Sequence, residues 1–165
     1  LQSWTSDNCP LIPCFYAEPS NGGIRLWIHV PTISERINFG SKYEEWIRDR
    51  STSICYGNNW QTLLGNKLNN EAKFYPDKIN CAITLELFID KESNIVDWEF
   101  FLSTIKPVAI ISKEQLISLK AKKPSSRLTP AKLKTIKPYI NILENIYFHF
   151  HFKYNKHAHS FLLMR

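Results

Sequence analysis

The stretch that decides the fold is residues 82–105, which read AITLELFIDKESNIVDWEFFLSTI. Apolar side chains at odd positions up to Ile89 alternate with Thr84, Glu86 and Phe88, and this period of two is typical of a half-buried strand. The polar segment 90–94 predicts a turn. A second strand over 95–105 would place Val96, Trp98 and Phe100 on one face and Asp97 and Glu99 on the other. Two such strands joined by a short polar turn predict an antiparallel hairpin.

Shorter elements are expected before the hairpin. They are a turn at 21–23, a strand over 24–30, a helix over 41–49 and a strand over 52–56. The helix is predicted because Ser41 and Glu44 form a capping box, which would satisfy free amides of the first turn. The strand over 24–30 is predicted from bulky β-forming residues such as Trp27 and Ile28.

Prolines shape the expected ends of the chain. Residues 1–20 are expected to be irregular, because Pro10, Pro13 and Pro19 would interrupt regular structure. After the hairpin, the expected elements are a short strand over 108–111, a helix over 113–122 capped by Ser112, and a helix that starts at Thr129-Pro130 and ends or kinks at Pro138. The predicted fold class is therefore α+β, a mostly antiparallel sheet with a few flanking helices.

The composition is that of a globular protein, with 44% hydrophobic and 13% aromatic residues over 165 positions, which excludes a disordered or collagen-like chain. No apolar run is long enough for a membrane span, and no signal peptide is apparent, so a cytoplasmic protein is expected. The four cysteines form no Cys-x-x-Cys pair, which favours reduced thiols over a zinc site. The net charge of +6 is compatible with a polyanionic partner.

The segment from Gly22 to Tyr56 carries the most informative motifs. It contains GGIRLWIHV and then, from Gly40, GSKYEEWIRDRSTSI. This resembles the RNB family of ribonuclease II/R-type 3′→5′ exoribonucleases. In that family a strand ending in a Val/Ile-His-Ile-Ala-Asp pattern is followed by Gly-Ser-Pro-Leu-Asp, a basic helix and Arg-Gly-Thr-Ser-Val-Tyr-Leu. The residues that fall in register are His29, Gly40, Ser41, Arg48, Arg50, Thr52 and Ser53.

The resemblance continues through 62–68, the hairpin at 82–105 and the segment 111–119, and covers roughly residues 5–120. It implies an RNB-like N-terminal portion over 1–120. Residues 121–165 would form a basic helical segment and a divergent C-terminal tail of the same, partial RNB-type domain. The family domain is much longer than this chain and carries a further catalytic acid in its C-terminal half, so complete hydrolysis by this chain alone is not expected.

The family performs Mg²⁺-dependent 3′→5′ hydrolysis of RNA with a cluster of four aspartates. In family sequences these aspartates occur in the motif Thr-Ile-Asp, followed by five further residues and then Asp-x-Asp-Asp-Ala. Matching Thr5 and Ala17 to this pattern places Asp7 at the first carboxylate, and Pro13, Phe15 and Tyr16 at the other three. Mg²⁺ takes oxygen ligands, which these three residues do not supply in a usable form. Asp7 is thus the one metal ligand expected, and activity is expected to be absent or very weak.

Two further positions depart from the family pattern. Thr32 stands where the family has an acid, and Cys55 stands where it has an aromatic residue that can stack on an RNA base. Tyr56 follows one position later, where a regular strand would turn it to the opposite side. Tyr56 remains the aromatic candidate for RNA contact.

The expected partner is single-stranded RNA, with no membrane and no small-molecule cofactor. The candidate RNA-binding residues are Arg48, Arg50, Tyr56, Lys120, Lys122, Lys123 and Arg127. The last four lie in a window between Glu114 and Glu144 that contains no acid, which favours a phosphate-binding patch. A solvated helical face remains the alternative for the lysines, as does a bracing role for the two arginines.

Other interpretations stay open. The His-x-His pairs at 149–151 and 157–159 could ligate a transition metal, although an edge strand or a diverged tail explains the same pattern. His29 is interpreted as a hydrogen-bonded structural residue rather than a base. Two rival functions also remain, namely a non-catalytic RNA-binding or regulatory module and a non-functional truncated fragment.

Overall fold

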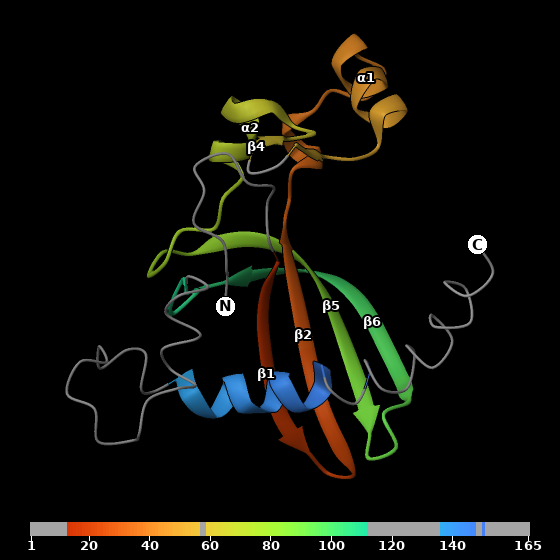
Figure 1. Ribbon diagram of the computed structural model, residues 1–165, viewed down its shortest axis with the longest axis vertical. Coiled ribbons are helices and arrows are strands. Elements are labelled where there is room, and N and C mark those ends of the chain that lie inside the picture. Colours follow the sequence, from red (N-terminus) through yellow and green to blue (C-terminus); the bar gives the residue numbers. More distant parts are fainter. Residues whose placement is uncertain (1–12, 57–58, 112–135, 148–149, 151–165) are drawn as a thin grey trace.

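The computed structural model describes residues 13–56, 59–111, 136–147 and 150. Its main feature is a four-stranded antiparallel sheet with the order β1-β2-β5-β6 (Figure 1). The strands are β1 (Cys14–Ser20), β2 (Gly23–Pro31), β5 (Asn80–Asp90) and β6 (Ile95–Ile105). The predicted class, a mostly antiparallel sheet with a few helices, is confirmed.

The predicted hairpin is the β5–β6 pair, which has the sheet's longest strands. Its turn is closed by Asp90, whose backbone amide donates to the Asn94 carbonyl at 3.0 Å and whose Oδ1 accepts from the Asn94 amide at 2.7 Å. The register shifts between Phe88 and Ile89, because Ile89 faces Ile95 and Val96 is left over as a bulge. The alternating apolar pattern therefore located both strands correctly.

The expectation that residues 1–20 are irregular is wrong for 14–20, which form β1. Pro19 is accommodated because β1 is an edge strand, where a missing backbone N–H need not break a ladder. The turn into β2 uses Gly22 at φ 89°, a conformation that favours glycine. A Cβ on Gly23 would collide with the carbonyl oxygen of Ile89 on β5, so close strand packing also requires glycine there.

Between β2 and β5 the chain forms a group of small elements, seen above the sheet in Figure 1. They are the 3-10 turn Ser34–Arg36, α1 (Lys42–Arg50), β3 (Ile54–Tyr56), β4 (Asn59–Gln61) and α2 (Gly65–Glu71). The predicted cap is confirmed, because Ser41 Oγ accepts from the Glu44 amide at 3.2 Å. The Glu44 carboxylate accepts from the Gly40 amide instead of the Ser41 amide, one residue earlier than in a capping box.

Residues 136–147 form a helix that packs across β1 and β2 (Figure 1). On it, Ile142, Leu143 and Ile146 contact a buried cluster made of Ala17, Leu26 and Ile89. Pro138 does not end the described helix, which continues for nine residues beyond it, whereas the start of the helix predicted from Thr129-Pro130 lies outside the described residues. A proline removes one backbone donor, but its fixed φ is itself compatible with a helix.

The strand expected over 108–111 is absent, and residues 106–111 have no regular structure. Ile111 is buried against Ile136 and Ile140 of the helix, so its apolar character serves packing and not strand pairing. The Pro107 carbonyl accepts from the Asp77 amide at 3.0 Å, which ties this segment to the loop before β5. The helices expected over 113–122 and from 129 lie outside the described residues.

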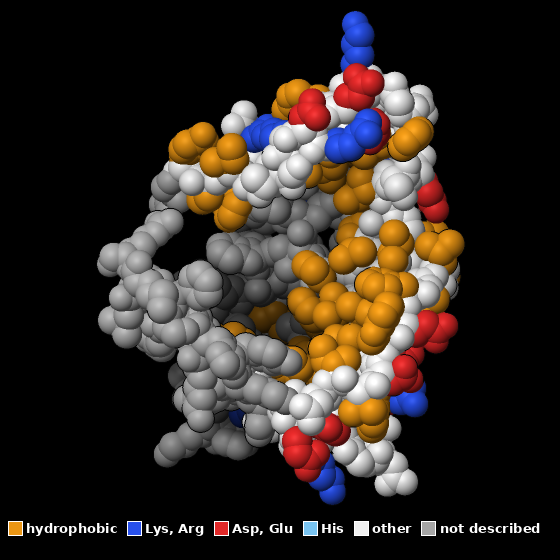
Figure 2. Space-filling model, turned by 90° about the vertical axis from the view of Figure 1, so that its right-hand side faces the viewer, with side chains coloured by type: hydrophobic (Ala, Val, Ile, Leu, Met, Phe, Trp, Pro, Cys, Tyr) orange, Lys and Arg blue, Asp and Glu red, His pale blue; other side chains and the backbone are white. Residues whose placement is uncertain are grey.

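The helix at 136–147 covers only part of the sheet face on which it packs. On β6, Trp98 and Leu102 are 62% and 75% exposed, although they pair with Leu87 and Ile83 on the core-facing side of β5. Figure 2 looks onto the β6 side and shows hydrophobic side chains gathered there. Within the part of the chain that the structure describes, no helix is long and apolar enough to cross a membrane.

Candidate nucleic-acid interface

A pocket of about 450 Å³ lies where the β1 edge of the sheet meets the segment after β6 and the start of the described helix. We call it the aromatic pocket. Its lining residues are Cys14, Phe15, Tyr16, Trp27, His29, Ile105, Lys106, Pro107, Val108, Ala109, Ile136 and Tyr139. Most of these side chains are apolar, and Lys106 is the charged residue among them.

Tyr16 is the central aromatic residue of this pocket. It lies directly opposite Trp27 in the β1–β2 ladder, and their ring centroids are 5.3 Å apart. The ring centroid of Tyr139, on the helix, lies 5.5 Å from that of Tyr16, so Tyr16 contacts rings from two other elements. The Tyr16 hydroxyl donates to Glu18 Oε2 at 2.9 Å, and this bond to a carboxylate raises the pKa of the phenol.

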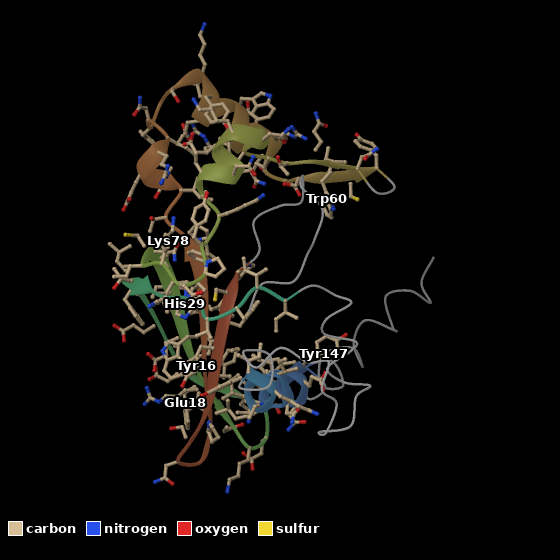
Figure 3. All side chains as sticks on the ribbon, turned by 90° about the vertical axis from the view of Figure 1, so that its left-hand side faces the viewer. Tyr16, Glu18, His29, Trp60, Lys78 and Tyr147 are labelled. Atoms are coloured by element: carbon tan, nitrogen blue, oxygen red, sulfur yellow. The ribbon has the colours of Figure 1, made fainter. Side chains whose placement is uncertain are left out.

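His29, which lines the pocket, belongs to a polar network within the sheet. His29 Nδ1 lies 2.7 Å from Thr84 Oγ1, which lies 2.5 Å from Ser103 Oγ. Burial of the imidazole lowers the pKa of His29. Thr84 is fully buried, so its hydroxyl is not available to attack a substrate. The predicted hydrogen bonding of His29 is confirmed, and Figure 3 shows this residue on the sheet with Tyr16 and Glu18.

The described residues do not fit a two-metal Mg²⁺ site. Of the four positions at which the motif match predicts the family's acids, three are described, and they hold Pro13, Phe15 and Tyr16. Two of these side chains line the aromatic pocket and are uncharged. Within the described residues, no group of three or more His, Cys, Asp or Glu side chains could hold a metal ion. Asp7, the expected remaining ligand, lies outside the described residues.

Arg48 and Arg50 both lie at the end of α1, but they make different contacts. Arg48 Nη2 donates to Glu44 Oε2 at 2.9 Å, an exposed pair one helical turn apart. Arg50 Nη2 donates to the Gln61 carbonyl at 3.2 Å, and its guanidinium lies 5.1 Å from the Trp46 ring centre. Arg50 therefore braces the β3–β4 hairpin against α1, while a guanidinium still has further donors for a phosphate.

Tyr56 ends β3 and is 66% exposed, so its ring is accessible. Cys55 is exposed too, because β3 and β4 form a separate two-stranded sheet with little cover on either side. The strand alternation that separates the two side chains therefore buries neither of them. The other candidate RNA-binding residues, Lys120, Lys122, Lys123 and Arg127, lie outside the described residues, as does the His-rich tail.

The aromatic pocket is a feature that sequence reasoning missed. Its three contacting rings come from two consecutive strands and from a helix more than a hundred residues later, and only the strand register and the helix position bring them together. One signal was present in the sequence, because Arg25, Trp27 and His29 alternate with the apolar Ile24, Leu26 and Ile28. That alternation separates a polar and aromatic face of β2 from the core face. On the polar face, the Arg25 guanidinium forms an ion pair with the Glu86 carboxylate on β5.

Comparisons with known proteins agree with this architecture. A family model for the RNB domain matches residues 2–162. No curated protein sequence matches the chain. Among solved structures, yeast Ssd1, described as a pseudonuclease, is similar at a TM-score of 0.63 and 22% identity, over 91% of this chain and 19% of that one.

Two structures of Mycoplasma genitalium RNase R are also similar. The complex with ribose-methylated single-stranded RNA matches at a TM-score of 0.67 and 16% identity, over 88% of this chain and 22% of that one. The complex with double-stranded RNA matches at 0.66 and 16%, over 88% and 26%. At these identities the likeness concerns the fold, and the chain spans about a quarter or less of each structure. Because the family model matches nearly the whole sequence, this chain belongs to the RNB domain family.

Proposed function

We propose that this RNB-family chain binds single-stranded RNA in the cytoplasm and does not hydrolyse it. The proposal rests on the match to the family motif, in which Pro13, Phe15 and Tyr16 take the positions of three carboxylates. Phe15 and Tyr16 line an apolar pocket, which is a poor environment for a hydrated divalent ion.

The loss of the carboxylates removes the chemistry of phosphodiester cleavage. In a two-metal mechanism, the ions stabilise the attacking water and the leaving oxygen, and acidic side chains hold the ions in place. A phenol hydrogen-bonded to Glu18 with a raised pKa stays protonated at neutral pH, and it offers no anionic oxygen to a metal. Asp7 alone would leave most of the coordination shell of each ion unfilled by protein.

The basic residues support RNA binding. We assign phosphate contacts to Arg48, to the free donors of Arg50, and to the acid-free stretch with Lys120, Lys122, Lys123 and Arg127. The exposed Tyr56 ring is a suitable surface for a stacked base. One similar structure is an RNase R complex with single-stranded RNA, which supports the choice of partner.

Filter binding of a 5′-labelled single-stranded RNA at two salt concentrations tests the proposal. Each phosphate contact lowers the logarithm of the binding constant by about 0.7 per tenfold increase in salt. Replacing Lys120, Lys122 and Lys123 with glutamine together is expected to reduce that slope by about 2. The matched control replaces Lys67, Lys73 and Lys91, which changes the net charge equally but should alter the slope less.

RNA recovered from the same reactions is expected to keep its full length in the presence of Mg²⁺. Absence of salt-sensitive binding in the unmodified chain would overturn the RNA-binding part of the proposal. Equal effects of the two triple substitutions would show that net charge alone attracts the RNA, and would remove the assigned basic stretch from the interface.

A further inference from the structure

The aromatic pocket has the properties of a site for a flat ring. We propose that it binds an unpaired nucleobase, stacked on Tyr16, and this assignment rests on the proposed binding of single-stranded RNA. The site would select for bases that are free of pairing, because a base within a duplex could not enter it.

The dimensions of the pocket suit such a ligand. Its volume of about 450 Å³ falls within the roughly 300–1,000 Å³ of small-molecule sites, and its lining is mainly apolar with a few polar groups. A base offers a flat apolar face with polar edges, which matches this lining. A phosphate or a hydrated ion would instead lose solvation against the apolar walls.

Tyr16 is arranged to present its ring. Its ring is tilted against the rings of Trp27 and Tyr139, and 41% of the residue remains exposed for a stacked base. The two neighbouring rings and the hydroxyl's bond to Glu18 hold the side chain in one position, so little rotamer freedom is lost on binding. An exposed and already ordered aromatic ring is the usual platform for base stacking.

Two polar side chains, those of His29 and Lys106, line the same pocket. The Nδ1 atom of His29 is engaged by Thr84, which leaves Nε2 to meet a polar edge of a base. Burial keeps this imidazole neutral at pH 7, because the pKa is lowered. Lys106 also lines the pocket and is exposed, so its ammonium group can contact the phosphate attached to the bound nucleotide.

The test uses a single-stranded RNA with 2-aminopurine at one position, because the emission of this base is quenched when it stacks on an aromatic ring. Binding is expected to quench the emission, and Tyr16→Ala is expected to abolish the quenching and weaken binding about tenfold. Tyr16→Phe keeps the ring and removes the hydroxyl, so it should retain both signals. Trp98→Ala removes an exposed aromatic residue on β6, 62% exposed against 41% for Tyr16, and should change neither.

The outcomes separate this inference from the proposed function. RNA that binds without quenching, or that binds Tyr16→Ala as tightly as the unmodified chain, would overturn the pocket and leave RNA binding intact. Free 2-aminopurine riboside that binds and is quenched, with no affinity for RNA, would support the pocket and overturn RNA binding. Loss of binding in Tyr16→Phe as well as in Tyr16→Ala would overturn stacking as the source of affinity.

Discussion

The same apolar face of the sheet is covered at one edge and bare at the other. Over β1 and β2, the helix at 136–147 buries Leu26 to 7% exposure, while on β6 the corresponding face leaves Leu102 at 75%. Both positions hold leucine in a strand with alternating polarity. The difference teaches that the pattern sets which face is apolar, whereas the neighbouring elements decide how much stability that face contributes.

The largest expected difference in the free energy of unfolding comes from replacing one leucine with alanine at each edge of the sheet. Leu26→Ala removes packing against Ala17 and Ile89 and should lower the free energy of unfolding by about 2–5 kcal/mol. Leu102→Ala should change it by no more than about 0.5 kcal/mol. Urea unfolding followed by far-UV circular dichroism measures both. Equal losses would mean that β6 is also covered in solution.

The polar network in the buried part of the sheet should give the next largest effect. Thr84→Val keeps the shape of the side chain but removes the hydroxyl that meets His29 and Ser103, at a cost of about 1–3 kcal/mol. Thr104→Val, on the exposed side of β6, is the matched control and should be close to neutral. A neutral Thr84→Val would contradict the view that the network depends on this hydroxyl.

Helix α1 resembles the bare edge in that it buries no residue, so its stability depends on local bonds. Ser41→Ala removes the cap to the Glu44 amide and should lower the free energy of unfolding by about 0.5–2 kcal/mol. Ser41→Gly should lower it by only about a few tenths of a kcal/mol. Hydrogen exchange at the amides of the first turn of α1 reports the change locally. If both variants exchange alike, the cap does not hold the helix.

The smallest effect concerns pH. Because the pKa of His29 is lowered in the folded chain, the unfolded chain takes up a proton first as the pH falls below about 6.5. Stability contributed by the neutral imidazole is therefore full above that pH and is lost as the pH falls towards the folded pKa. His29→Asn should flatten this part of the stability profile in urea titrations. A steeper profile in the variant would reverse the assigned sign.

The sequence allowed the hairpin, the α1 cap and the RNB family to be predicted, because these depend on neighbouring residues and on motif order. Two predictions were wrong for physical reasons. Pro19 is tolerated at a sheet edge, and Ile111 is buried by packing without a strand. In each case the surroundings of the residue, which a local pattern does not contain, decided its structure.

The candidate site also combines a feature that the sequence predicts with one that it does not. The family motif predicts that Pro13, Phe15 and Tyr16 replace acids, whereas no pattern in the sequence predicts the aromatic pocket. Tyr16 meets Trp27 only through the β1–β2 register, and it meets Tyr139 only through the position of the helix. Contacts between residues more than a hundred positions apart follow from the assembled fold and not from spacing.

The central claim is that an RNB fold has lost its metal-dependent chemistry while keeping an RNA site. The most direct measurement incubates a 5′-labelled single-stranded RNA with saturating protein, with Mg²⁺ or with EDTA, and resolves the products on a denaturing gel. The account predicts bound RNA of full length in both conditions. Stepwise shortening from the 3′ end with Mg²⁺, abolished by EDTA, would contradict it and would require carboxylate ligands beyond the described residues.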